Sequence, residues 1–340
     1  MVYSRRRMNF FLFVLSHAYR SVCQAKNLVY RWKLIKPKKA PFPVISIGNI
    51  TFGGSEKTPL VMKIISLLLD QGYKPAMITR GYKGNWEKSG GVLSDGRNIL
   101  GRWEDSGDEA FMVAKNIPRA GIFVGRNRLA SCYRAKNTGF DVGVLDDGFQ
   151  HRRIHRDLDI VLYDPSEKNA LREPLSSLER AQVVLIKSMD KSTGKKTARS
   201  SLIPSSAFEY RVTCRGLFKL GNQAANIPMA KIRGKKVMAF CGIARPQRFY
   251  SLLQEQEIHP VSFLKFPDHH PYPQPSLDKI IQTFRRAKAD ALITTEKDAV
   301  KLAPLMAGQK FPACYLKIDV EIEKKFYSTV LSFLQNKDRS

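Results

Sequence analysis

Residues 48–58 read GNITFGGSEKT, and this stretch decides the fold expected for the chain. It lies between the apolar runs 44–47 and 60–69, so it is expected to join a buried strand to a helix. A glycine-rich turn followed by Lys-Thr at a helix start is the setting of a phosphate-binding loop, in which backbone N–H groups hold phosphate oxygens. The strict pattern G-x-x-x-x-G-K-[ST] is not met, because Thr51 and Glu56 occupy its glycine positions. An ordinary strand-to-helix turn is therefore the alternative.

Short apolar runs, mostly β-branched, continue along the chain at 76–79, 121–124, 142–145, 160–163 and 183–186. Helical patterns such as 60–69 and 108–115 separate them, and this alternation predicts an α/β fold. We expect a P-loop NTPase-like, mainly parallel sheet with helices on both faces.

The composition changes around 190–235 to Lys, Ser, Thr, Gly and Asn, with strand-like runs at 208–212 and 217–220. A second α/β unit is indicated by the apolar runs 237–241, 261–266, 291–294 and 314–318. We therefore expect four parts: a basic N-terminal helix over 1–40, a P-loop domain over 41–213, a connector over 214–235 and a smaller C-terminal α/β lobe over 236–340.

The charge of the chain indicates an anionic partner. Its 340 residues include 57 Lys+Arg and 30 Asp+Glu, a formal net charge of +27, which suits nucleic acid, a membrane surface or a phosphorylated substrate. A hydrophobic content of 43% excludes wholesale disorder. The five cysteines are scattered without a C-x-x-C pair, which argues against a disulfide framework or a cysteine-rich zinc site and favours a reducing compartment.

The first 50 residues hold ten of the basic residues and no acidic one. A cluster at Arg5–Arg7 precedes the apolar run 8–15, which is too short to span a membrane. No clean signal-peptidase site follows, and Phe11, Val14 and Ala18 recur at helical spacing. We expect an interfacial amphipathic helix whose basic flanks contact anionic lipid, with a helix packed on the domain core as the alternative.

Two pairs of carboxylates are candidates for the chemistry. Asp146 and Asp147 end the apolar run 142–145, at the edge where open α/β sheets bind ligands, which suits a Walker-B-like role at Mg²⁺. Asp108 and Glu109 begin a helical pattern, where capping is the alternative.

Residues 266–272 read FPDHHPY. The Asp-His-His group is too compact for a zinc site by itself, so a base or proton relay and a surface turn are its two interpretations. Arg80, Arg126, Arg128 and Arg172 suit phosphate recognition, although single arginines are more often solvated.

Taken in order, these motifs resemble the tetraacyldisaccharide 4′-kinase family, the lipid A kinases of Gram-negative envelopes. The matching stretches are GNITFGGSEKTPLV, ITRGYKG, SGDEAFMVAK, VGRNR, LDDGFQHRRIHRDLDIVLYD, LREPLSSLERA, FCGIARPQRF, FPDHHPY and LITTEKDAVKL. The resemblance implies a two-lobed P-loop kinase that transfers the γ-phosphate of ATP, with Mg²⁺, to the 4′-hydroxyl of a tetraacylated glucosamine disaccharide 1-phosphate, giving lipid IVA.

The resemblance also implies roles for residues. Asp108 would accept the hydroxyl proton, with Lys57 at the phosphates and His269 as the partner of Asp108; His269 is preferred to His270 because it directly follows Asp268. The implied ATP-binding residues are Thr51, Phe52, Gly53, Gly54, Ser55, Glu56, Lys57 and Thr58. The implied metal ligands are Thr58, Glu109, Asp146 and Asp147. The implied substrate or phosphate contacts are Arg80, Tyr82, Arg128, Gln150, Arg172 and Glu173.

Glu56 departs from the family, which usually has glycine before Lys-Thr. Its charge could be offset by Lys57 or turned to solvent, and a catalytically weak paralogue is one alternative. A basic nucleic-acid-dependent P-loop NTPase and a peripheral membrane scaffold are the others. We expect a peripheral or monotopic protein on the cytoplasmic face of the bacterial inner membrane, with anionic lipid as a partner and with no nucleic acid and no obligate protein partner.

Overall fold

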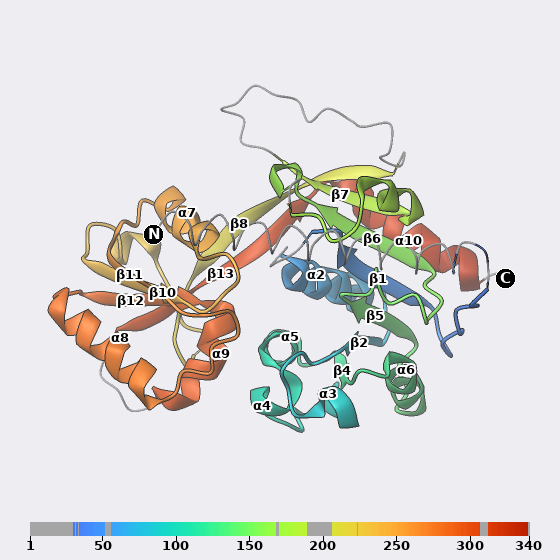
Figure 1. The fold of residues 1–340 in the computed structure, drawn as a ribbon, viewed down its shortest axis with the longest axis horizontal. Coiled ribbons are helices and arrows are strands. Elements are labelled where there is room, and N and C mark those ends of the chain that lie inside the picture. The colour runs from blue at the N-terminus through green and yellow to red at the C-terminus, as the bar shows by residue number, and fades with distance from the viewer. Residues whose placement is uncertain are drawn as a thin grey trace, which may run out of the picture. The chain divides into compact units, whose positions relative to one another are not determined.

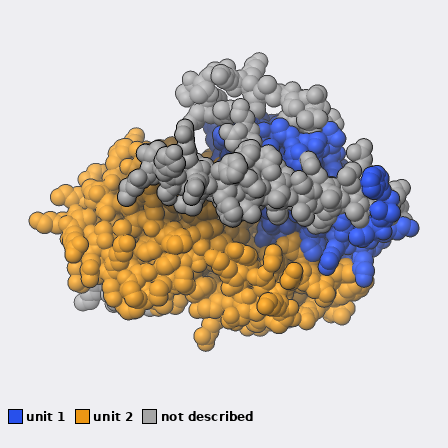
Figure 2. Space-filling model, viewed as in Figure 1, with its two compact units in different colours: residues 1–57, 142–211, 322–340 blue, residues 58–141, 212–321 orange. Residues whose placement is uncertain are grey.

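The computed structural model describes residues 30, 32, 34–51, 56–167, 170–188, 206–222, 224–306 and 312–338. Most of the expected N-terminal helix lies outside the described residues, as do Phe52, Gly53, Gly54 and Ser55 of the glycine-rich loop. The chain divides into two compact units that are each discontinuous in sequence (Figure 2). Unit 1 contains residues 1–57, 142–211 and 322–340, and unit 2 contains residues 58–141 and 212–321. The domain boundaries expected along the chain stay a prediction.

Unit 1 is built on parallel strands that are buried along their length (Figure 1). Their order is β5 (Val142–Asp146), β1 (Val44–Asn49), β6 (Leu158–Tyr163) and β7 (Val183–Lys187), followed by the first residues of β8 (Ala207–Lys219). Near-continuous apolar sequence is what a parallel strand needs when both of its faces are covered. The helical elements are η1 (Pro165–Glu167), η2 (Leu175–Arg180) and α10 (Lys324–Asp338).

The first part of unit 2 follows the glycine-rich loop through helix α2 (Lys57–Asp70), whose first residue belongs to unit 1. Strand β2 (Pro75–Thr79) runs parallel to β4 (Gly121–Val124), and β3 (Gly91–Asp95) runs antiparallel to β4. The helices are α3 (Trp86–Ser89), α4 (Trp103–Ser106), α5 (Asp108–Asn116) and α6 (Arg128–Asn137). Strand β3 was not expected, because only its middle residues are buried and its sequence carries no continuous apolar run.

The second part of unit 2 is a parallel sheet with helices on both faces. Its strand order is β11 (Pro260–Lys265), β10 (Val237–Cys241), β12 (Ala291–Thr295) and β13 (Ala313–Ile322). Helix α7 (Pro246–Glu255) covers one face of this sheet, and α8 (Gln274–Arg286) and α9 (Glu296–Leu305) cover the other (Figure 1). Alternate residues of β10 pack into the core clusters on these two sides. Two short elements complete the unit, β9 (Asn226–Ile227) and η4 (Met229–Lys231).

The expected α/β fold with a mainly parallel sheet is confirmed, and each run expected to form a strand overlaps a strand to within one residue. The strand-like runs 208–212 and 217–220, which were expected on either side of a domain boundary, fall in one long strand, β8. This strand pairs with β7 at its start and with β9 near its end.

Among the residues that the structure describes, no helix has the length and apolar character required to cross a membrane.

Candidate active site

An ion network occupies the carboxyl ends of β1 and β5 in unit 1. The Lys57 Nζ atom lies 3.2 Å from Asp147 Oδ1 and donates to Asn49 Oδ1 at 3.3 Å. The Arg172 Nη2 atom donates to the same two oxygens, at 2.6 Å to Asp147 and 2.7 Å to Asn49. Asp147 adopts a φ of 47°, in the left-handed region that short polar residues tolerate at turns. Two cations therefore share one carboxylate, next to the loop expected to hold phosphate.

Glu56, the departure from the family pattern, adopts a φ of 51°. Glycine takes this conformation freely, whereas a residue with a Cβ carries a cost of about 1 kcal/mol. Its Oε1 atom lies 3.2 Å from Nζ of Lys187, at the end of β7, and this lysine also lies 3.6 Å from Asp164. The charge of Glu56 is thus offset by Lys187, a residue that sequence reasoning did not single out, while Lys57 pairs with Asp147.

The side chains of Gln150 and Glu173 stabilise the position of Asn49. The Gln150 side-chain amide donates to the Asn49 carbonyl at 2.9 Å and to Glu173 Oε1 at 2.8 Å. Glu173 is buried and also pairs with Arg180. Asp146 is buried at the end of β5. These contacts fix the strand end from which the Lys57–Arg172 network projects.

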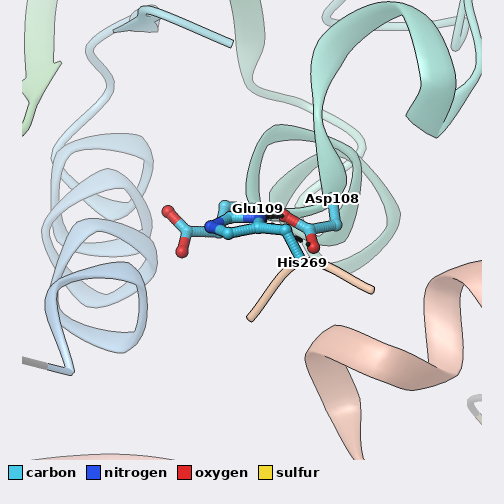
Figure 3. A group of neighbouring side chains, drawn as sticks. All are labelled: Asp108, Glu109 and His269. Atoms are coloured by element: carbon cyan, nitrogen blue, oxygen red, sulfur yellow. Dashed lines mark hydrogen bonds and ion pairs between the residues drawn. The ribbon is translucent and has the colours of Figure 1, made fainter. Parts of the chain in front are cut away.

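The second site lies within unit 2, where Asp108 and His269 meet (Figure 3). Asp108 is the first residue of α5, follows Gly107 at a φ of 82°, and is only 4% exposed. The His269 Nδ1 atom lies 2.9 Å and 3.1 Å from the two Asp108 carboxylate oxygens. The neighbouring His270 instead pairs with Ser276 and stacks on Phe266.

The backbone of the FPDHHPY segment is held in an uncommon conformation. His269 and Tyr272 adopt φ values of 59° and 55°. The His269 N–H donates to the Gly242 carbonyl at 3.1 Å, and the Gly242 N–H donates to Asp298 Oδ2 at 2.9 Å. A Cβ at position 242 would meet the Tyr272 hydroxyl at 2.9 Å, so glycine permits this close approach. Left-handed backbone of this kind persists where surrounding contacts over-determine it.

Two lysines of α9 complete the charge balance around Asp108. Lys301 is fully buried, with Nζ 3.2 Å from Asp108 and 3.3 Å from Asp298. Lys297 contacts Glu109 at 3.0 Å, Asp268 at 3.3 Å and His269 Nε2 at 3.2 Å. Burial raises the pKa of the Asp108 carboxyl, but the His269 hydrogen bond and the two ammonium groups outweigh it and hold that pKa well below its usual value.

The stretch LITTEKDAVKL contains Lys297 and Lys301, but the sequence alone assigned no role to either lysine. A signal was present, because Lys297 and Lys301 are four residues apart at the start of a helix and therefore share a face.

A family model described as tetraacyldisaccharide-1-phosphate 4′-kinase matches residues 8–335. The chain belongs to this family. A tetraacyldisaccharide 4′-kinase of Syntrophus aciditrophicus is 33% identical, with 95% of this chain and 92% of the relative covered. The kinase of Pelobacter propionicus is 36% identical over 84% of this chain and 81% of the relative. A crystal structure of LpxK from Aquifex aeolicus in complex with ATP is 27% identical, with a TM-score of 0.76, and covers 96% of this chain and 99% of that one.

The family, the fold and the kinase class expected from the sequence are thereby confirmed. The nucleic-acid-dependent NTPase and the membrane scaffold are not favoured, because the match extends through both units and is not confined to the phosphate-binding loop.

Three residues of unit 2 were expected to contact the substrate, Arg80, Tyr82 and Arg128, and they differ in exposure and in partners. Tyr82 is 54% exposed and packs edge-on against the His269 ring, with centroids 5.3 Å apart. Arg80 forms an ion pair with Glu87 at 2.7 Å, and Arg128 is buried as the first residue of α6. Tyr82 therefore lies beside the Asp108–His269 pair, and its substrate role and those of the two arginines stay predictions.

Glu109 joins Asp108 and His269 in a group whose potential ligand atoms all lie within 4.8 Å of one another (Figure 3). Two carboxylates and an imidazole are a donor set that metal ions accept. The Glu109 carboxylate, however, already lies 3.0 Å from the Lys297 ammonium group.

Proposed function

We propose that this kinase transfers the γ-phosphate of ATP to the 4′-hydroxyl of a tetraacylated glucosamine disaccharide 1-phosphate, giving lipid IVA for lipid A biosynthesis. Family membership along nearly the whole chain supports the substrate class. The structural observation that carries the proposal is the buried Asp108 carboxylate, hydrogen-bonded to His269 and flanked by two lysines.

In this proposal Asp108 acts on the acceptor hydroxyl. Its neighbours keep it ionised, so it accepts a hydrogen bond from the hydroxyl and aligns the oxygen with the γ-phosphorus. Phosphoryl transfer passes through a loose transition state, in which alignment and charge neutralisation matter more than a strong base. As the bond between the acceptor oxygen and the γ-phosphorus forms, the hydroxyl becomes more acidic and its proton passes to an Asp108 carboxylate oxygen. The bond between the γ-phosphorus and the β–γ bridging oxygen breaks, and ADP leaves with that oxygen.

The Lys57 network is suited to the donor phosphates. Phosphate oxygens accept hydrogen bonds from lysine and from the arginine fork as a carboxylate does. A triphosphate can therefore take over the contacts that Lys57 and Arg172 make with Asp147. The remaining loop residues, Phe52 to Ser55, are expected to contribute backbone N–H groups.

Magnesium is the expected companion of ATP. The Thr58 hydroxyl and the Asp146 and Asp147 carboxylates are hard oxygen donors, which is the ligand chemistry that Mg²⁺ prefers, and in this proposal they would hold the ion. When bound, Mg²⁺ neutralises charge on the phosphate oxygens.

The proposed location is the cytoplasmic face of the bacterial inner membrane, with peripheral attachment. Trp32, Leu34 and Ile35 are at least half exposed and are followed directly by the exposed Lys36, Lys38 and Lys39. Exposed apolar side chains beside a basic cluster combine the two signals that stable attachment to anionic lipid requires.

The test is transfer of radiolabel from [γ-³²P]ATP to the tetraacyldisaccharide 1-phosphate in mixed micelles. We expect a labelled lipid with Mg²⁺ present, and a strongly reduced yield from an Asp108→Asn variant. ATP hydrolysis that is stimulated by RNA, with no labelled lipid, would overturn the proposal. Sedimentation with anionic vesicles at low and high salt separately tests the membrane attachment, and binding that is absent at both salts would contradict it.

A further inference from the structure

We propose that Lys297 is a positioning residue that holds His269 as the neutral Nδ1–H tautomer, and that its ammonium group fills the position a metal ion would take among Asp108, Glu109 and His269. The inference deepens the proposed function and rests on it for the catalytic consequence. Its structural content can be tested without any acceptor lipid.

The hydrogen-bonding chemistry around the His269 ring selects one tautomer. Nδ1 lies 2.9 Å from an ionised Asp108 carboxylate, which can only accept, so Nδ1 must carry the proton. Nε2 lies 3.2 Å from the Lys297 ammonium group, which can only donate, so Nε2 presents its lone pair to that group. The Asp268 carboxylate also faces Nε2, but its Oδ2 atom lies 3.7 Å away, beyond hydrogen-bond distance.

The ammonium group is itself held from three directions. Lys297 also lies 3.0 Å from Glu109 and 3.3 Å from Asp268, and its side chain is 16% exposed. Burial alone would lower the pKa of Lys297, but the charges of Glu109, Asp108 and Asp268 outweigh it and keep the group protonated. The Lys297 side chain therefore remains a hydrogen-bond donor toward Nε2 of His269 at neutral pH.

The same contacts argue against a divalent cation at this group. A metal ion bound to Glu109 and to Nε2 of His269 would lie within a few ångströms of the ammonium group, where two positive charges repel strongly. Glu109 was expected from the family resemblance to bind metal. Here the Glu109 carboxylate instead has a lysine counter-ion 3.0 Å away.

For the reaction, the contact between Lys297 and His269 fixes the orientation of the Asp108 carboxylate. With Nε2 engaged by Lys297, His269 cannot rotate without losing a hydrogen bond at each ring nitrogen, so the Asp108 carboxylate stays fixed for the acceptor hydroxyl. His269 then acts through its N–H toward Asp108, and the acceptor proton goes to the carboxylate.

The first test is the tautomer of His269 in the wild-type protein, read from two-bond ¹H–¹⁵N correlations of ¹⁵N-histidine-labelled protein. The sequence contains six histidines, and the His269 signals are identified by their loss in His269→Asn. We expect a protonated Nδ1 and an unprotonated Nε2, both unmoved when Mg²⁺ is added without nucleotide. A protonated Nε2, or a shift of Nε2 with Mg²⁺, would overturn the proposal.

The second test compares Lys297→Met with Lys297→Arg, and with Lys279→Met as a matched change on the exposed face of α8. We expect Lys297→Met to release the tautomer and to lower kcat by about 100-fold at an almost unchanged KM for ATP, as removal of a tautomer-fixing partner does elsewhere. Arginine should restore part of kcat, and Lys279→Met should match wild type. A wild-type tautomer and kcat in Lys297→Met would overturn the role of Lys297. If wild type itself labels no lipid, the proposed function fails while the spectra still test the tautomer.

Discussion

The two charged clusters of this kinase are built differently. In unit 1, Asp147 has a side chain that is 40% exposed and shares Lys57 and Arg172. In unit 2, Asp108 is 4% exposed, and its partners His269, Lys297 and Lys301 have partners of their own. In the first cluster two cations contact one carboxylate, and the proposed function has a phosphate take over those contacts. The second is a set of internally compensated charges that stays assembled without a ligand.

The difference indicates a division of labour. The Asp147 carboxylate is partly exposed, so water screens its ion pairs, and we expect an incoming triphosphate to compete for the two cations at small cost. A buried carboxylate with every partner in place is costly to disturb, and it keeps its geometry for the reaction. The variants below are expected to affect nucleotide binding at the first cluster and turnover or stability at the second.

The largest expected effect comes from Asp108→Asn. An amide keeps the size of the side chain but cannot take the acceptor proton, so kcat should fall by about 1,000-fold while the affinity for ATP changes little. Turnover with saturating lipid and ATP binding by calorimetry measure the two quantities. Asp278→Asn, an exposed change on α8, is the control. A kcat within a few-fold of wild type would remove Asp108 from the reaction.

Lys301→Met should chiefly affect stability. Lys301 is fully buried against Asp108 and Asp298, so its removal leaves two buried carboxylates without their shared counter-ion, a loss of about 3–5 kcal/mol in the free energy of unfolding. Urea unfolding of this variant and of Lys279→Met provides the comparison. Equal stability of the two variants would contradict a structural role for the buried ammonium group.

A smaller effect is expected at the phosphate-binding loop, from Lys187→Met. Without Lys187 the Glu56 carboxylate loses the ammonium group 3.2 Å away and repels the incoming phosphates more strongly, so the KM for ATP should rise about fivefold, equivalent to about 1 kcal/mol. Glu56→Gly alone should leave that KM almost unchanged, and the double variant Glu56→Gly/Lys187→Met should recover the wild-type value. Additive effects in this double-mutant cycle would show that the two side chains are not coupled.

The smallest expected effect is the dependence of stability on acid. A carboxyl whose pKa is lower in the folded chain stabilises it above the unfolded pKa of about 3.9 and loses that contribution as the pH falls toward the folded value. The stability difference between wild type and Asp108→Asn should therefore be constant from pH 7 to pH 5 and shrink below about pH 4. Urea titrations at each pH measure this stability difference. A difference that grew on acidification would contradict a lowered pKa of Asp108 in the folded chain.

Much of the molecule was predictable from local sequence. The runs around 44–47 and 60–69 specify a buried strand and a helix by their apolar pattern, and the glycine-rich turn between them indicates phosphate binding. The placement of Asp108 at a helix start and of Asp147 after a strand also followed from neighbouring residues. Local patterns of this kind depend on residues within a few positions of one another.

The pairings that make the sites depend on tertiary structure. His269 meets Asp108 across 161 positions of the chain, and Lys187 meets Glu56 across 131. The four-residue spacing of Lys297 and Lys301 predicts a shared helix face, but nothing local indicates which carboxylates these lysines or Lys187 meet in a chain with a net charge of +27. Sequence by itself determined the family, the buried parallel strands and the residue types available for catalysis, but not strand β3. Tertiary structure alone decided which charges compensate one another, because an ion pair depends on the distance between side chains that the strand order and helix packing bring together.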